Sequence, residues 1–238
     1  MQTAKPALPW LVLISRSIFF LLAQGLIALF LALSGSNAAW AESARWWVFF
    51  PIFANLASIG LLVLAFRTEG KRYLDILRFS RQTVKTDLLW LFGSSIIGLP
   101  IAAAPMNILG TAIFGDPIIP INLLFRPLPT WALAVAILFP LTIGLAELPS
   151  YFGYVMPRLF GGKVPWLAYL VAALFLGLQH CFLPFIADGN YLLWRGLMYL
   201  PFALYAGLMI KLRPSLLPYF AVIHTLMDFS ALSVYFML

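Results

Sequence analysis

Seven long apolar stretches constrain the fold of this chain more than any other feature of its sequence. They cover approximately residues 9–34, 46–66, 88–108, 129–157, 164–184, 191–210 and 215–236. A helix of about 20 apolar residues crosses the hydrocarbon core of a bilayer. Hydrocarbon offers no partner to backbone N–H and C=O groups, so a spanning segment must satisfy them internally, as a helix does. The sequence therefore predicts an all-α, polytopic transmembrane bundle with about seven spans.

The composition leaves no room for a sizeable soluble domain. The chain has 238 residues, of which 63% are hydrophobic and 10% are charged, whereas soluble domains carry about 25% charged residues. The single cysteine, Cys181, excludes an internal disulfide framework. We expect one integral membrane domain, in which residues 1–87 supply anchor spans and a basic loop and residues 88–238 form the core with the functional site. The first apolar stretch is longer than the hydrophobic region of a signal peptide, so it is expected to remain as an anchor.

Basic residues predict the topology. The net charge of +7 is compatible with nucleic-acid binding, but the basic residues flank the apolar stretches, as orientation signals do. The positive-inside rule places the N-terminus and the loop 67–87 on the cytoplasmic side of the plasma membrane. The eleven basic residues expected on that side are Lys5, Arg67, Lys71, Arg72, Arg78, Arg81, Lys85, Arg158, Lys163, Lys211 and Arg213. The opposite side is expected to hold Arg45, Arg126 and Arg195, and Arg16 lies within the first span, where it either snorkels or lines the bundle.

The basic loop 67–87 also contains apolar residues. Tyr73, Leu74, Ile76, Leu77 and Phe79 give one side of it an apolar character. This pattern predicts an amphipathic helix lying on anionic lipid headgroups. A solvated charged loop is the alternative.

Four ionisable residues lie inside apolar stretches and are the candidates for function. They are Glu147, His180, His224 and Asp228. Ionisable groups at membrane depth are expensive and usually face a bundle interior or a water-filled cavity. Counted at 1.5 Å per residue from the cytoplasmic ends of their spans, they lie roughly 14–22 Å deep, within about two helical turns of one another. His224 and Asp228 are four residues apart and share one helix face.

Each of these residues also has a purely structural interpretation. A single buried histidine is commonly a hydrogen-bonded core residue, and Glu147 could join two helices as a protonated hydrogen-bonding group. Asp228 either holds His224 in one tautomer or takes part directly. A matched depth for the only two histidines of the chain favours a shared site. Gly177, one turn before His180, would let a neighbouring backbone approach.

The order of these residues resembles the CAAX protease and bacteriocin-processing (Abi) family of intramembrane proteases. The first family motif is a Glu-Glu pair, three residues and Arg, often with a Gly and a Pro-Arg-Leu ending; here the stretch from Glu147 to Leu159 is ELPSYFGYVMPRL. The second is an aromatic residue three positions before a His; here it is FLGLQH, with Phe175 displaced by one position. The third is His, three residues, and Asn or Asp, here HTLMD from His224 to Asp228.

The chain departs from the first motif at two positions. Leu148 stands where the family has its second glutamate, and Phe152 stands where it has arginine. The support that these two residues would give to Glu147 is therefore missing locally. Tyr151 and Tyr154 follow Glu147 by four and seven residues, which predicts that they share its helix face. They are the residues nearby that could replace this support.

The resemblance implies hydrolysis of a peptide bond in or near the membrane. Glu147 would act as general base on a water that His180 helps to position, and His224 with Asp228 would stabilise the oxyanion. In the alternative arrangement, Glu147, His180 and His224 would bind Zn²⁺, whereas a metal-free glutamate mechanism uses the same residues. The implied partners are membrane lipids and a prenylated CAAX-type, leader or membrane peptide.

Two other functions fit the same sequence. A catalytically inactive relative would bind a membrane peptide as a chaperone or immunity protein, and the changes at Leu148 and Phe152 favour it. A small-solute transporter would use Glu147 as a proton-coupled group. We find no internal repeat of the kind that many transporters contain.

Overall fold

The computed structural model describes residues 6–236, and in this range the secondary structure consists of helices joined by short connections, with no β-strand. Seven of its helical segments are long and apolar enough to cross a membrane. The predicted all-α, polytopic transmembrane bundle is therefore confirmed. Lys5, one of the residues used to predict the topology, lies outside the described residues.

Four of the spanning segments are single long helices, and three combine a helix with shorter elements. The main helices are α1 (Leu8–Leu33), α3 (Phe49–Thr68), α4 (Val84–Phe114), α6 (Thr130–Ala136), α7 (Leu138–Leu148), α9 (Pro165–Leu178), α10 (Gly189–Leu212) and α11 (Leu217–Ser233). The shorter elements are α2 (Ala39–Ser43), α5 (Ile118–Leu124), α8 (Met156–Arg158), the 3₁₀ turns η1 (Ala44–Trp46), η2 (Tyr73–Leu77), η4 (Leu159–Gly162), η5 (Gln179–Phe182), η6 (Pro214–Leu216) and η7 (Val234–Phe236), and the π-helical turn η3 (Pro149–Val155).

The third and fourth spans are longer than the sequence predicted. They cover Val84–Phe114 and Thr130–Gly162, instead of residues 88–108 and 129–157. Apolar composition marks the hydrocarbon length, whereas helical hydrogen bonding continues into the polar ends. Helix α4, for example, ends where Gly115 takes a left-handed φ of 79° and its N–H binds the carbonyl of Thr111.

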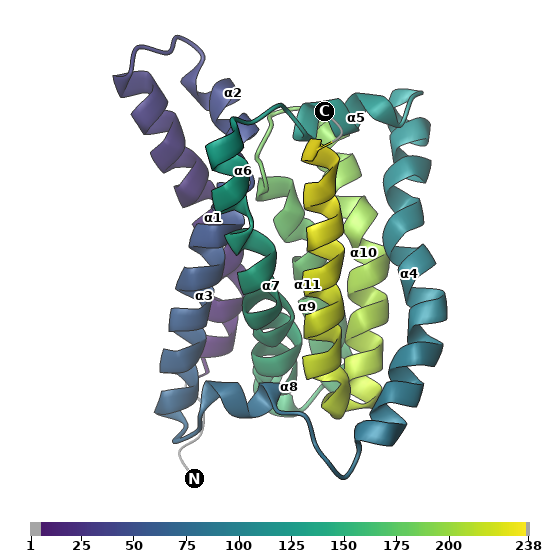
Figure 1. Ribbon diagram of the computed structural model, residues 1–238. Helices are drawn as coiled ribbons and strands as arrows, with labels where there is room; N and C mark the ends of the chain where they lie inside the picture. The colour runs from purple at the N-terminus through teal and green to yellow at the C-terminus, as the bar shows by residue number, and fades with distance from the viewer. Residues whose placement is uncertain (1–5, 237–238) are drawn as a thin grey trace.

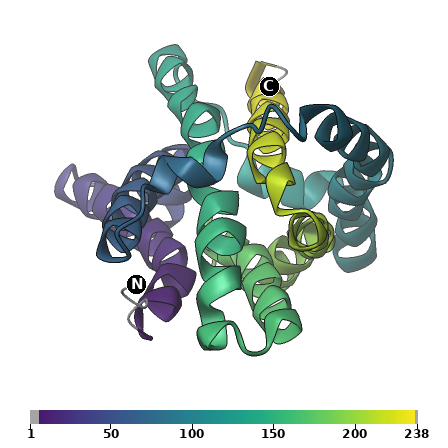
Figure 2. The same cartoon turned by 90° about the horizontal axis from the view of Figure 1, so that it is seen from below.

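Helix α7 lies at the centre of the bundle, between α3 on one side and α11 on the other (Figure 1). Helix α1 packs along α3, and α10 packs against α9 and α4. Seen along the bundle, α4 stands at the edge opposite α1 and α3 (Figure 2). Helix α4 is correspondingly exposed, because only Asp87, Ser94, Gly98 and Gly110 are buried along its length.

Two apolar clusters fill the interior, one toward each end of the bundle. The first contains Leu13, Leu62, Tyr151 and Phe220, and the second contains Phe20, Phe50, Ile143 and Leu232. Along α1, α3, α7 and α11, one cluster gives way to the other at the residues that flank Arg16, Asn55, Glu147 and His224. Buried polar residues therefore form a layer between the two clusters.

Pro149 explains the change of helix type after α7. Proline has no N–H, so the carbonyl four residues earlier loses its helical partner. That carbonyl belongs to Leu145, and the hydroxyl of Tyr73 donates a hydrogen bond to it. The seven residues Pro149–Val155 form the π-helical turn η3. Turns of this kind are frequent at functional sites. The hydrogen bond from Tyr73 ties the η2 turn to α7 at Leu145, two residues before Glu147.

The basic residues predicted to share one side do gather at one end of the bundle, which we call the basic end. The α3–α4 connection and α8 lie there, together with the beginning of α1 (Figure 1). Arg158 in α8 binds Glu69 after α3 through Nε–Oε1 and Nη2–Oε2 contacts of 2.6 and 2.8 Å. Arg213 binds Asp87 of α4 at 2.5 Å. These ion pairs join segments that are far apart in sequence.

The predicted amphipathic helix exists only as the short η2 turn, which runs across the basic end (Figure 1). Tyr73 is buried there, whereas Leu74 and Phe79 are exposed. Arg195, which was predicted for the opposite side, is only 1% exposed and lies inside α10. Helix α10 begins at Gly189, before the apolar stretch, so Arg195 enters the interior.

We expect the Glu69–Arg158 pair to make stability depend on pH. The Arg158 guanidinium, hydrogen-bonded to the Glu69 carboxylate, holds the pKa of that carboxyl below its ordinary value of 4.5. A lowered pKa in the folded state stabilises the protein fully above the unfolded pKa, and the contribution disappears as pH falls through the folded pKa. Glu69→Gln should cost about 1–3 kcal/mol at neutral pH.

Thermal unfolding of the detergent-solubilised protein between about pH 3 and pH 7 measures this effect. The difference between wild type and Glu69→Gln should shrink as the pH falls. Glu42→Gln, which changes an exposed acid in α2, is the control. A difference that stays constant across this range would contradict the assignment.

Candidate functional site

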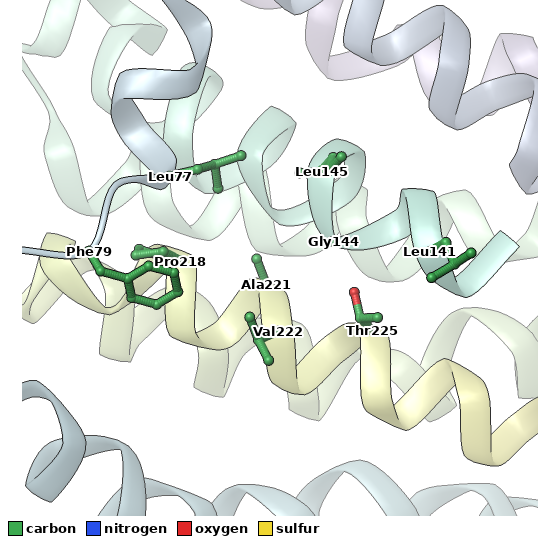
Figure 3. Close-up of a pocket in the computed structure, with 9 residues that line it drawn as sticks. All are labelled: Leu77, Phe79, Leu141, Gly144, Leu145, Pro218, Ala221, Val222 and Thr225. Carbon is green, nitrogen blue, oxygen red and sulfur yellow. The ribbon is translucent and has the colours of Figure 1, made fainter. Parts of the chain in front are cut away.

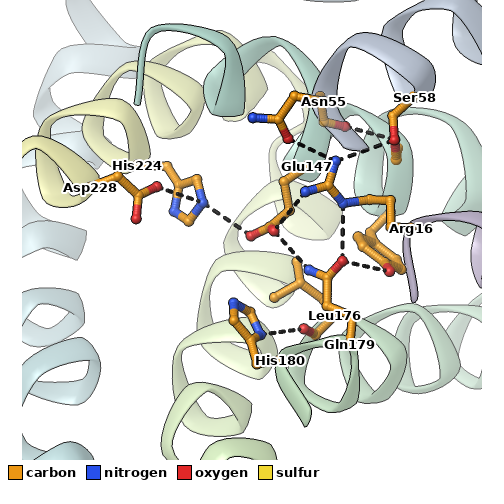
Figure 4. Close-up of polar contacts among 12 residues, drawn as sticks. Arg16, Asn55, Ser58, Glu147, Leu176, Gln179, His180, His224 and Asp228 are labelled. Carbon is orange, nitrogen blue, oxygen red and sulfur yellow. Dashed lines mark hydrogen bonds and ion pairs between the residues drawn. The ribbon is translucent and has the colours of Figure 1, made fainter. Parts of the chain in front are cut away.

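Glu147 lies in the last turn of α7 and is 1% exposed. One of its carboxylate oxygens, Oε2, accepts a hydrogen bond from Arg16 Nη2 at 3.2 Å and another from Gln179 Nε2 at 2.7 Å (Figure 4). Arg16 comes from α1 and Gln179 from η5. An ion pair and an amide from two other elements thus fix the orientation of the carboxylate.

Arg16 is fully buried, and its other donors are also used. Nε donates to Gln179 Oε1 at 3.0 Å, and Nη1 lies 3.1 Å from Asn55 Oδ1 and 3.3 Å from Ser58 Oγ (Figure 4). Of the two alternatives from the sequence, lining the bundle is confirmed and snorkelling is wrong. A charge can remain in an apolar interior when it is paired and hydrogen-bonded.

The two tyrosines that could support Glu147 have different surroundings. Tyr151 donates a hydrogen bond to Gln179 Oε1 at 3.1 Å, so it supports the carboxylate through the amide. Tyr154 packs against Phe66 and lies under the Arg158 guanidinium. The prediction that both share the face of Glu147 is wrong for Tyr154, because a π-helical turn needs more residues per turn than an α-helix.

His224 and Asp228 face the second oxygen of Glu147 from α11. His224 Nε2 lies 3.0 Å from Glu147 Oε1 and 3.4 Å from Asp228 Oδ2 (Figure 4). These contacts are close but not aligned as hydrogen bonds. Consequently Glu147 Oε1, both ring nitrogens of His224 and Asp228 Oδ2 are buried without a hydrogen-bond partner among residues 6–236.

His180 approaches the same region from η5. Its Nδ1 lies 2.9 Å from the carbonyl oxygen of Leu176 and 3.2 Å from that of Gly177. Both are acceptors, so Nδ1 acts as a donor here. The second ring nitrogen lies on the side of Glu147 and His224 (Figure 4).

The structure thus brings the predicted residues Glu147, His224 and Asp228 into contact, and places His180 beside them without a direct bond to Glu147. Sequence analysis missed Gln179 and Asn55 completely. Both are amide side chains inside apolar stretches, and both are fully buried. Such residues usually face the bundle interior, and this alone could have identified them. As predicted, Gly177 allows a close approach, here by the α10 backbone at Leu200.

A groove lies immediately outside the site, between η2, α7 and α11 (Figure 3). It has a volume of about 250 Å³ and is lined mostly by apolar residues: Leu77, Phe79, Leu141, Gly144, Leu145, Pro218, Ala221, Val222 and Thr225. At Gly144 the two helices nearly touch, since an added Cβ would come within 2.6 Å of the Ala221 carbonyl oxygen. The groove is therefore separated from Glu147 and His224 by about one helical turn.

In the part of the chain that the structure describes, no three His, Cys, Asp or Glu side chains are grouped so that they could hold a metal ion. One oxygen of Glu147 already binds Arg16, whose positive charge would oppose a second cation nearby.

Comparison with known proteins adds no family assignment: no protein-family model, curated protein or solved structure matches the chain.

We expect the Arg16–Glu147 pair to behave as a coupled unit. Arg16→Met leaves a carboxylate in the interior without its counter-ion, which should cost about 3–5 kcal/mol. Glu147→Gln in the same chain removes that charge and should restore part of the loss. A double-mutant cycle of thermal stability in detergent measures the coupling. Additive losses in the two single variants and the double variant would show that the pair is not coupled.

Proposed function

We propose that the protein is an intramembrane endopeptidase that hydrolyses a peptide bond of a prenylated or membrane-embedded peptide, with a water activated by Glu147. The observation that carries this proposal is the set of unpaired polar atoms. Glu147 Oε1, both nitrogens of His224 and Asp228 Oδ2 converge in the interior with unused hydrogen-bonding capacity. Buried polar groups of this kind typically bind water.

The two oxygens of Glu147 have different roles. Oε2 is held by Arg16 and Gln179, so the carboxylate cannot rotate freely. Oε1 then points at His224 and is available to accept a proton from a water. Orientation of this kind supplies much of the rate that an enzyme gains from general-base catalysis.

The reaction requires no group beyond water and the peptide. Glu147 takes a proton from the water, which His180 helps to position, and the water oxygen bonds to the carbonyl carbon of the substrate. The negative charge that develops on the carbonyl oxygen is stabilised by N–H donors, and His224, next to Asp228, supplies one. The C–N bond then breaks, and the proton held by Glu147 passes to the leaving amine.

Arg16 and Gln179 support Glu147 in place of the glutamate and arginine that the family has at positions 148 and 152. The glutamate and arginine of the family motif are missing from η3 and its neighbour, but a guanidinium from α1 and an amide from η5 contact the carboxylate instead. This relocated support favours a functional Glu147 over a degenerate motif.

The groove beside the site suits an apolar substrate. Leu145 and Ala221 line it, two and three residues from Glu147 and His224 respectively. A prenyl chain or an apolar peptide segment could bury its surface there at about 25 cal/mol per Å². Its scissile bond would enter between α7 and α11.

A binding protein without catalytic activity is the second candidate. The observation that favours it is the ion pair itself, because Arg16 already occupies one oxygen of the Glu147 carboxylate and gives the pair a purely structural role. Such a protein would hold a membrane peptide in the same groove without cleaving it.

A cleavage assay in proteoliposomes separates the two candidates. A panel of fluorogenic prenylated and membrane-spanning peptides is incubated with wild type, Glu147→Gln and the control Glu42→Gln. We expect wild type and the control to cleave at least one peptide, and Glu147→Gln to lose a factor of about 10²–10⁴ in rate. Peptide binding without cleavage by wild type would contradict the protease proposal and support the binding protein.

Metal removal tests the choice of a metal-free mechanism. Because Glu147 is paired with Arg16, we expect cleavage to persist after dialysis against a strong chelator. Metal analysis of the purified protein should show no stoichiometric zinc. Zinc at one ion per chain that is lost in both His180→Ala and His224→Ala would contradict this mechanism.

A further inference from the structure

Arg195 is a buried cation that the proposed mechanism does not use. It is 1% exposed, inside α10. No carboxylate in residues 6–236 forms an ion pair with it. A buried charge without a counter-ion is costly, so its hydrogen bonds must hold it in place.

The donors of Arg195 bind the turn that carries two site residues. Nε donates to the carbonyl oxygen of His180 at 3.3 Å, and Nη2 donates to that of Leu183. Both carbonyls lie at the end of the η5 turn, and that of His180 also accepts the N–H of Leu183. The last carbonyls of a helical segment lack partners within it, so Arg195 closes the end of this turn. The same turn contains Gln179, which binds Glu147.

A third donor connects Arg195 with the ring of His180. Nη1 lies 3.3 Å from the hydroxyl of Tyr199. The Tyr199 ring in turn stacks on the His180 imidazole, with centroids 3.9 Å apart and planes inclined by 26°. The imidazole is therefore held from one side by stacking and at Nδ1 by the carbonyls of Leu176 and Gly177.

We propose that Arg195 and Tyr199 are the positioning residues of His180, which lock its ring in the Nδ1-protonated form with Nε2 directed into the site. Arg195 fixes the backbone of the η5 turn, and Tyr199 fixes the ring plane. Nearly every donor of Arg195 is used within the protein, so it acts through His180 and does not bind an anion itself. The expected effect on the cleavage rate rests on the proposed peptidase function. The positioning of the His180 ring rests only on the contacts of Arg195 and Tyr199.

Nitrogen NMR of the imidazole tests the positioning directly. The chain has two histidines, so ring-¹⁵N-labelled protein with the His224→Asn substitution reports His180 alone. We expect one neutral tautomer with the proton on Nδ1. Tyr199→Leu removes the stacked ring and should shift both ring-nitrogen resonances toward those of exchanging tautomers.

Tyr199→Phe is the matched control, because it keeps the ring and removes only the hydroxyl. It should retain the wild-type tautomer. Arg195→Met and Arg195→Lys test the second residue, and lysine, which cannot reach all three acceptors, should give an intermediate spectrum. Identical spectra for Tyr199→Leu and Tyr199→Phe would overturn the role of Tyr199. An unchanged spectrum in both Arg195 variants would overturn that of Arg195.

The rate measurement adds a readout that a purely structural role would not change. In a chain that retains His224, Tyr199→Leu and Arg195→Lys should lower kcat with little change in KM, by up to about 100-fold, since misplacement of a catalytic group by about 1 Å costs this much. If wild type cleaves no peptide, the proposed function fails while the NMR result still decides the positioning. Equal losses in kcat for Tyr199→Leu and Tyr199→Phe would overturn the proposal that stacking positions His180.

Discussion

The buried ion pair between Arg16 and Glu147 is the contact on which the rest of the interior depends. Neither side chain is more than marginally exposed, and two charges taken out of water repay that cost only if their remaining hydrogen bonds are satisfied. Asn55, Ser58 and Gln179 satisfy those of Arg16. The pair therefore requires α1, α3, α7 and η5 to meet at one height, and it fixes the polar layer between the two apolar clusters.

The polar layer is satisfied on one side and unsatisfied on the other. On the side of α1 and α3, each donor of Arg16 has an acceptor, and these contacts explain stability. On the side of α11, Glu147 Oε1 and the ring nitrogens of His224 have no hydrogen-bond partner among residues 6–236. These atoms differ from the other buried polar atoms without partners, such as the hydroxyls of Tyr191 and Tyr235, in that several of them converge at one place. Their position beside a groove between α7 and α11 is what a site for water and a peptide would require.

The helices that carry the site residues become irregular next to the site, at the π-helical turn after α7 and at the η5 turn after α9. Pro149 frees the Leu145 carbonyl, which receives the hydroxyl of Tyr73, and the π-helical turn that follows directs Tyr151 toward Gln179. At the end of α9, the turn that carries Gln179 and His180 leaves carbonyls for Arg195. In both places a backbone group that a regular helix would have satisfied is served by a distant side chain, which links the site to η2 and to α10.

The sequence by itself determined the all-α membrane bundle, because apolar length leaves a helix as the only spanning structure. It also identified Glu147, His224 and Asp228, since ionisable groups in apolar stretches are rare and matched depth is readable from residue counts. Only the tertiary structure decided that Arg16 and Gln179 support Glu147, that Tyr154 faces away from it, and that Arg195 is buried against the η5 turn. Arg16 and Gln179 lie 131 and 32 residues from Glu147 along the chain. Contacts across such separations depend on helix rotation and packing, which hydrophobic periodicity within a single span does not encode.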